Sequence, residues 1–300
     1  MALSDLQITT NSFLELGGPI FGKKVVSWNI RSRGIQVRTN VKVPQAMTKL
    51  SAKGTPKPYT SGDETAGNGV KFTDRILTAY QSKWDFDFDP EDFRNTYLAK
   101  ADGAPFVEAA NNQVADEYLA YLMTSTLYFG VRNAAGTTPA DICNGFAKLI
   151  ADEITAVALV PIITGAITSA NAVDKVELVA EGVPAWMRQD GATPFIVHCS
   201  YNVFDKYKKH YRTLNNFAFR PDETGRYKID GVNAYLMPQT FMGNSQRLIA
   251  TLDQNLVVGT DIDRVEVHAS LRRNIIEVRQ MMPLGVQIQD LDALVVNDQA

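Results

Sequence analysis

The chain has 300 residues, of which 45% are hydrophobic and 21% are charged, and its formal net charge is −3. This is ordinary globular composition, sufficient for one large domain or two small ones, and the near-neutral charge argues against a dedicated nucleic-acid-binding domain. The two cysteines, Cys143 and Cys199, lie far apart and form no C-x-x-C pair, which argues against a disulfide framework or a thiolate zinc site.

Residues 1–30 are predicted to form an extended arm. Apolar residues occur there, but glycine and proline at positions 17–19 and Gly22 interrupt any helix or strand period. The first residues lack a basic stretch followed by an apolar core, so no signal peptide is expected. The apolar side chains of such an arm need a partner elsewhere in the assembly.

Residues 31–88 are predicted to form one long β-hairpin. Apolar and polar residues alternate over residues 34–48, a second extended run covers residues 70–88, and the polar, glycine-rich segment between them is the expected tip. Fifteen residues at about 3.3 Å each would make an arm of roughly 50 Å. Because an isolated two-stranded ribbon is only marginally stable in water, we expect the hairpin to lie on another subunit.

Charge is polarised along this part of the chain. No Asp or Glu occurs between Glu15 and Asp63, although nine Lys and Arg residues do, and acids then cluster over residues 85–92. This pattern suits pairing between copies of the chain, and the alternative is a solvated basic loop. A nucleic-acid surface is less favoured because aromatic residues are scarce at the basic tip. The candidate subunit-interface residues are Trp28, Arg31, Arg33, Arg38, Lys42, Lys49, Lys53, Lys57, Asp85, Asp87 and Asp89.

Helices are predicted in the next part of the chain. Asp89 and Pro90 are typical of a helix start. Pro105 begins the longest expected helix, residues 105–129, with an apolar stripe along roughly 36 Å. Thr138-Pro139 starts another helix. The uncharged stretch 154–173 has the length of a membrane span, but its proline, glycines and polar residues favour the end of a helix followed by a buried strand.

Short strands alternate with helices from residue 162 onward. Ser200 is expected to cap a helix whose buried side includes Val203 and Phe204. Strands are predicted at residues 231–237, 247–251 and 256–258, and strong alternation continues over residues 264–296. The predicted fold class is therefore α+β.

Motifs for chemistry are scarce. The sequence has no nucleophile elbow, phosphate-binding loop or dinucleotide-binding motif. His198, Cys199 and Ser200 are adjacent, but neighbours on a strand point to opposite faces, so we do not interpret them as catalytic. The acids of residues 85–89 imitate a calcium loop, yet Pro90 and Thr96 replace its required Gly and Glu. We predict no catalytic, cofactor-binding or metal-binding residues, and no enzyme.

The order of these parts resembles the major capsid proteins of tailed bacteriophages, which have the Hong Kong 97-type fold. An arm, a long hairpin, a long helix, a mixed α/β region and a strand-rich tail follow one another as in that family. Local similarity lies in the strand before the Ser200 helix, in a late strand and turn, in the returning peripheral strands and in the chain ending: residues 194–200, 255–261, 273–288 and 293–297. No single motif is diagnostic.

The resemblance implies a domain division. Residues 1–30 would be the N-terminal arm and residues 31–88 the E-loop. The peripheral domain would comprise residues 89–135 and 264–290, with residues 105–129 as its spine helix. The axial domain would comprise residues 136–263 and 291–300.

The resemblance also implies a function without cofactors. Copies of the chain would build hexamers and pentamers of an icosahedral shell around double-stranded DNA, assembled in the cytoplasm of a bacterial host into a virion without a membrane. Expected partners are further copies, portal and scaffolding proteins, decoration proteins in some members, and packaged DNA held without sequence specificity.

Two departures and several alternatives accompany this resemblance. Many relatives begin with a cleaved scaffolding segment, whereas the arm here starts near Met1, so scaffolding is expected to be a separate protein. Some relatives cross-link Lys to Asn, and Lys49, Lys53 and Lys57 lie near the hairpin tip, but most members lack such bonds. The alternatives are an encapsulin-like compartment shell, a soluble α/β enzyme and another virion structural protein.

Overall fold

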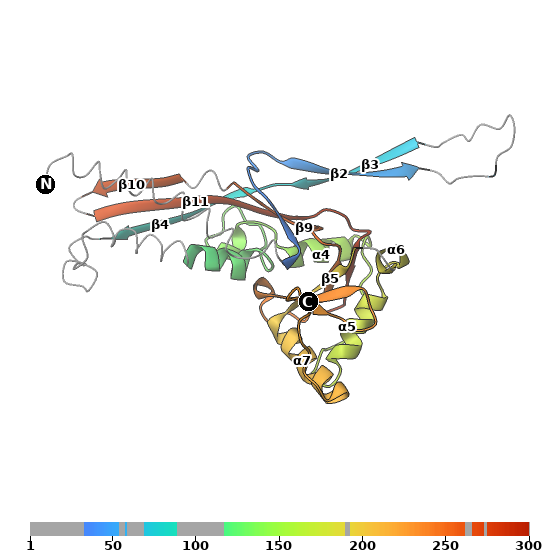
Figure 1. Ribbon diagram of the computed structural model, residues 1–300. Coiled ribbons are helices and arrows are strands. Elements are labelled where there is room, and N and C mark those ends of the chain that lie inside the picture. The colour runs from blue at the N-terminus through green and yellow to red at the C-terminus, as the bar shows by residue number, and fades with distance from the viewer. Residues whose placement is uncertain are drawn as a thin grey trace.

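The computed structural model shows an elongated β-sheet, a projecting hairpin and a wedge-shaped α/β unit (Figure 1). The predicted arm, the hairpin tip, the helix start at Asp89 and the first part of the long helix lie outside the residues that it describes. The described residues are 33–53, 58, 69–88, 117–189, 193–261, 266–272 and 275–299.

The elongated sheet is built around β11 (Ile275–Ile288), a strand of 14 residues. Its first half lies between β10 (Glu266–Arg272) and β4 (Tyr80–Phe88), and both of these strands are antiparallel to it. Its last residues pair with β9 (Leu256–Thr260), which in turn pairs in parallel with β1 (Ile35–Arg38). One continuous strand therefore joins the far end of the sheet to its base.

The hairpin consists of β2 (Gln45–Lys53) and β3 (Gly69–Leu77), two strands of nine residues that pair from Gln45–Leu77 to Lys53–Gly69. It is shorter than the range 31–88 that the sequence assigned to it, and each arm reaches roughly 30 Å. The single strand expected over residues 34–48 is in fact β1 and β2, which belong to different sheets. The break occurs where Asn40 adopts a φ of 65° and Pro44 lacks an N–H to donate.

The second predicted hairpin strand is also divided, into β3 and β4. The chain leaves the hairpin at Thr78 and crosses β11 at Gly285, where an added Cβ would lie 2.1 Å from the carbonyl oxygen of Thr78. Only glycine allows this close crossing. Strand β4 then pairs with β11 instead of extending the hairpin.

The α/β unit has a second sheet in the order β12-β8-β5-β7-β6. Its central strand β5 (Phe195–Ser200) is fully buried, and α5 (Ala172–Glu181) and α7 (Tyr201–Asn215) share one core with one face of the sheet. Ser200 caps α7 as predicted, since its Oγ accepts a hydrogen bond from the N–H of Val203. The other strands are β12 (Leu294–Val296), β8 (Ile249–Thr251), β7 (Ala234–Gln239) and β6 (Tyr227–Lys228), and α6 (Ala185–Arg188) precedes β5.

The predicted long helix is described only from Glu117. It is α-helical to Tyr121, continues as a π-helical turn η3 (Leu122–Thr126), and turns away before Gly130. A Cβ at Gly130 would lie 2.4 Å from the carbonyl oxygen of Cys143 and 2.5 Å from that of Thr126. This tight contact explains why the chain has glycine at this position.

Two predictions for residues 138–173 were wrong in detail. Thr138 caps only the 3-10 turn η4 (Pro139–Asp141), because Gly145 is extended and a separate helix α4 (Phe146–Thr155) begins after it. The buried strand expected after α4 is absent: between α4 and α5 there is a single bridge, from Ile162 to Asn297. Val160 and Ile163 are 76% and 82% exposed. No helix among the described residues is long and apolar enough to cross a membrane.

Candidate assembly surface

The projecting hairpin has an apolar outer face. Strand alternation places even-numbered residues of β2 and β3 on this face, where Leu50 lies directly opposite Phe72. Leu50, Val70, Phe72 and Ile76 are 64%, 56%, 65% and 57% exposed. We call these four residues the outer face of the hairpin. They are large apolar side chains that the described residues of the same subunit leave open to solvent, and the exposed Asp74 lies between Phe72 and Ile76 on the same face.

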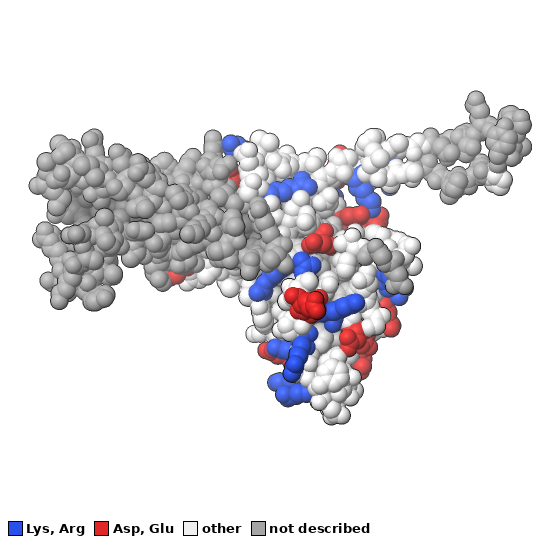
Figure 2. Space-filling model, in the orientation of Figure 1, with Lys and Arg blue, Asp and Glu red and all other residues white. Residues whose placement is uncertain are grey.

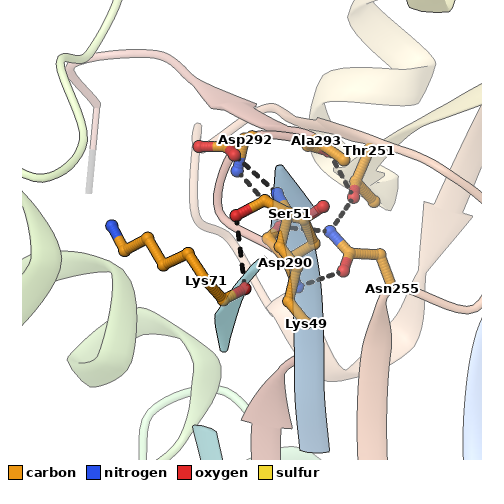
Figure 3. A network of polar contacts seen from close by, with 8 residues as sticks. All are labelled: Lys49, Ser51, Lys71, Thr251, Asn255, Asp290, Asp292 and Ala293. Atoms are coloured by element: carbon orange, nitrogen blue, oxygen red, sulfur yellow. Dashed lines mark hydrogen bonds and ion pairs between the residues drawn. The ribbon is translucent and has the colours of Figure 1, made fainter. Parts of the chain in front are cut away.

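The opposite face of the hairpin is anchored to the body by charge. Lys49 Nζ lies 2.6 Å from Asp290 Oδ1 and 2.5 Å from Asp292 Oδ2 (Figure 3). Arg75 Nη2 lies 2.7 Å from Glu153 Oε1 of α4 and donates to Gln287 Oε1 at 3.2 Å. Partial burial lowers the pKa of Lys49, but the hydrogen bonds and charges of the two aspartates outweigh this and raise it.

The loop after β11, which carries Asp290 and Asp292, is ordered by hydrogen bonds that do not involve Lys49. The side chain of Asn255 donates to Asp290 O at 2.8 Å and accepts from Asp290 N at 2.7 Å, and it also donates to Thr251 Oγ1 at 2.7 Å (Figure 3). Thr251 Oγ1 in turn donates to Ala293 O at 2.9 Å. Because this loop is already ordered, forming the anchor requires ordering mainly of the Lys49 side chain.

Apolar packing completes the base of the hairpin. Met47 and Leu77 are buried against Val41 and Val257, in a small cluster separate from the two main cores. The inner face near the base of the hairpin is therefore used by contacts within the subunit, through Met47, Lys49, Arg75 and Leu77, whereas Lys71 further out is exposed. The outer face cannot turn inward without breaking these contacts.

Asp85, the first residue of the acidic block, is also anchored within the subunit. Arg279 Nε of β11 lies 2.5 Å from Asp85 Oδ1, and Lys83 Nζ lies 3.2 Å from Asp85 Oδ2. The hydrogen bond from Arg279 is the main reason that the pKa of Asp85 is lowered. Trp84 points the other way and packs edge-on against Tyr118 and Tyr121. Strand alternation accounts for the opposite directions of these two neighbouring side chains.

The other candidate interface residues are scattered. Arg33 donates to Pro238 O at 2.7 Å, Arg38 donates to Gln36 at 3.4 Å, and Lys42 is exposed. Asp87 is exposed on β4, and Lys53 is described only as a backbone position of β2. Trp28, Arg31, Lys57 and Asp89 lie outside the described residues. The structure brings no two of the described candidates into contact, and their role between subunits stays a prediction.

The sequence-based predictions did not include the four apolar residues of the outer face or the aspartates that pair with Lys49. The alternation of Val70, Phe72 and Ile76 was a usable signal, because it marks one face of a strand. Asp290 and Lys49 are 241 residues apart, so nothing in the local sequence joins them.

The adjacent histidine, cysteine and serine are structural. His198 is completely buried, its Nδ1 lies 2.8 Å from Gln239 Nε2, and burial lowers its pKa to about 3. Burial also raises the pKa of Cys199. Ser200 Oγ donates to Ser245 O while it caps α7. A neutral imidazole and a protonated thiol without solvent contact offer no nucleophile to a substrate.

Comparisons with known proteins give fold similarity alone. No family model and no curated protein matches the sequence. Among solved structures, a chain of the satellite phage P4 procapsid superposes with a TM-score of 0.56 at 13% identity over 99% of this chain and 97% of that one. The capsid of Myoviridae phage XM1 gives 0.57 at 12% identity over 90% and 91%. An encapsulin of Synechococcus elongatus, SrpI, gives 0.52 at 10% identity over 89% and 85%.

Proposed function

Because the chain has the Hong Kong 97-type fold of phage capsids and encapsulins, we propose that it is a major capsid protein of a tailed bacteriophage. Its copies assemble into hexamers and pentamers of an icosahedral shell that encloses double-stranded DNA. The observation that carries this proposal is the outer face of the hairpin, which projects from the body and exposes four large apolar side chains.

Burial of the outer face supplies a driving force for assembly. Complete burial of a large apolar side chain is worth roughly 1.5–3 kcal/mol. The four side chains are each more than half exposed, so covering them contributes about 4–7 kcal/mol per copy. A contact of this size is weak alone and becomes decisive when every subunit of a shell repeats it.

The anchored inner face gives this surface a fixed direction. Lys49 and Arg75 hold the hairpin to the loop after β11 and to α4. A preorganised strand pair loses less conformational entropy on docking than a free ribbon would. The hairpin thus acts as a projecting element for a neighbouring subunit.

We further propose the domain division that the resemblance implies. Residues 1–30 form the arm, residues 31–88 contain the E-loop, residues 89–135 and 264–290 form the peripheral domain with its spine helix, and residues 136–263 and 291–300 form the axial domain. Portal, scaffolding and decoration proteins and packaged DNA are the further partners, in a virion assembled in the bacterial cytoplasm.

Electron microscopy of the expressed protein tests this proposal. Closed particles of uniform diameter are expected, with hexamers and pentamers visible after averaging. A protein that stays monomeric at high concentration, with and without the other structural proteins of its own genome, would contradict the proposal.

An encapsulin-like compartment is the second candidate, because the SrpI encapsulin shares the fold. Particles purified from the native source distinguish the two. Packaged double-stranded DNA together with portal and tail proteins supports the capsid, whereas a cargo enzyme inside a DNA-free shell supports the compartment.

A further inference from the structure

Helix α5 carries an acidic stripe on its outward side. Asp174, Glu177, Leu178 and Glu181 follow the i, i+3, i+4, i+7 spacing of one helix face, and we call them the acidic stripe. None of the three acids forms an ion pair with a described residue. Burial, followed by the charges of Asp174 and Glu181, raises the pKa of Glu177. Asp174 and Glu181 therefore have no cation paired with them among the described residues, whereas the charge of His210 on α7 also acts on Glu177.

Helix α7 carries the opposite charge with the same spacing. Asp205, Lys208, Lys209 and Arg212 again occupy positions i, i+3, i+4 and i+7. Together with Ala218 and Phe219 they line a hollow of about 360 Å³, which we call the basic hollow. Lys208 pairs with Asp205 at 3.0 Å, whereas Lys209 and Arg212 have no ion-pair partner among the described residues.

The two surfaces also match in their apolar parts. Leu178, 39% exposed, lies between the acids of its stripe. The floor of the basic hollow is apolar, formed by Ala218 and by Phe219, whose ring packs on Tyr207 and Tyr211. A leucine flanked by acids is complementary to an apolar floor rimmed by cations.

No ion pair joins the acidic stripe to the basic hollow within the described part of one subunit. Helices α5 and α7 contact each other on one face of the sheet, where the N–H of Val173 donates to His210 Nδ1. Asp174 and Glu181 of α5 and Lys209 and Arg212 of α7 are exposed, whereas Glu177 is half-buried on the side of α5 that is near Tyr207 of α7. Helix α7 lies to the left of α5 in Figure 1. Figure 2 shows Lys and Arg gathered on the α7 side of the wedge and Asp and Glu on the α5 side.

We infer that the acidic stripe of one copy packs into the basic hollow of the next, so that copies join head to tail in a closed ring. A contact between two different surfaces of identical subunits is heterologous, and it closes into a ring when the rotation permits. The inference rests on the proposed shell function and names the two faces that meet within each capsomer.

Charge reversal with compensation tests the pairing. Lys209→Glu with Arg212→Glu, and separately Asp174→Lys with Glu181→Lys, should each raise the subunit concentration for half-maximal assembly about tenfold at low ionic strength, and less at high ionic strength. All four changes in one chain leave the net charge unaltered and recreate attraction with the signs exchanged. This variant should assemble within about threefold of the unmodified protein.

Mixing offers a second readout. Equal amounts of the two reversed proteins can alternate around a ring of six, because each then presents the complementary charge to its neighbour, but a ring of five cannot alternate. Mixed hexamers without pentamers are therefore expected. Thermal unfolding of each subunit checks that the fold is intact, and Gln or Asn at the same positions replaces any variant that does not fold.

The outcomes separate this inference from the proposed function. If both reversed proteins form shells at the unmodified threshold, the pairing is wrong although the shell function stands. If each reversal blocks assembly and the combined variant does not restore it, these two faces do not meet. Unaltered assembly with loss of packaged nucleic acid would assign Lys209 and Arg212 to nucleic acid instead. Absence of any assembly by the unmodified chain overturns the proposed function, and this inference with it.

Discussion

Replacing Leu50 and Phe72 by threonine should prevent shell assembly while the subunit stays folded. The two side chains lie opposite each other on the outer face of the hairpin and are 64% and 65% exposed. Threonine suits a strand, so the subunit loses only their cross-strand contact, worth roughly 0.2–1 kcal/mol. In an assembled shell the loss is the burial of both side chains, about 2–4 kcal/mol per contact, which corresponds to association weaker by about thirtyfold to a thousandfold.

Sedimentation velocity and electron microscopy of the purified protein measure this effect. Lys71→Thr is the matched control, because Lys71 is exposed on the same strand but belongs to the opposite face. The control should assemble at the concentration that the unmodified protein needs. Shells formed by the double variant at that same concentration would refute the role of the outer face, provided that thermal unfolding shows both proteins folded.

Three further predictions concern the isolated subunit. Arg75→Ala leaves the largely buried carboxylate of Glu153 unpaired and should lower the free energy of unfolding by about 2 kcal/mol in denaturant titrations. Desolvation alone would raise the pKa of Asp298, but hydrogen bonds from Thr164 and Gly165 outweigh it and lower this pKa to about 2. The ionised carboxylate therefore stabilises the fold above about pH 4, and this contribution is lost as the pH falls towards 2. Asp298→Asn should remove this part of the acid dependence of Tm. Gly130→Ala, which forces a Cβ against two carbonyl oxygens, should cost about 2–4 kcal/mol, whereas Gly69→Ala, with no atom within 4 Å of the new Cβ, should cost almost nothing.

Local patterns in the sequence predicted local structure correctly. Ser200 caps α7 through a backbone N–H only three residues away, so the signal and its partner lie in one short segment. The orientation of Trp84 and Asp85 follows from strand alternation in the same way. The order of the elements was enough to indicate the fold.

Errors arose where the structure depends on distant parts of the chain. The alternation over residues 34–48 continues through Asn40, but the positive φ of that residue and the missing N–H of Pro44 accompany a break, and β1 and β2 lie in different sheets. The apolar stretch after α4 suggested burial, yet Val160 and Ile163 are on the surface. Only one partner of the Lys49 anchor could be predicted from the sequence. Lys49 was a candidate interface residue, but Asp290 and Asp292, which pair with it, follow β11 near the other end of the chain.

Strand β11 makes the subunit mechanically continuous. Its Arg279 holds Asp85 near one end, and its Gln287 bonds both Arg75 and the backbone of Ile76 near the other. Fourteen residues of unbroken ladder span roughly 46 Å with no loop to absorb a displacement. A pull on the far tip of the sheet is therefore transmitted to the base of the hairpin. In the proposed shell, a force from one neighbour would then change the tilt of the hairpin against another.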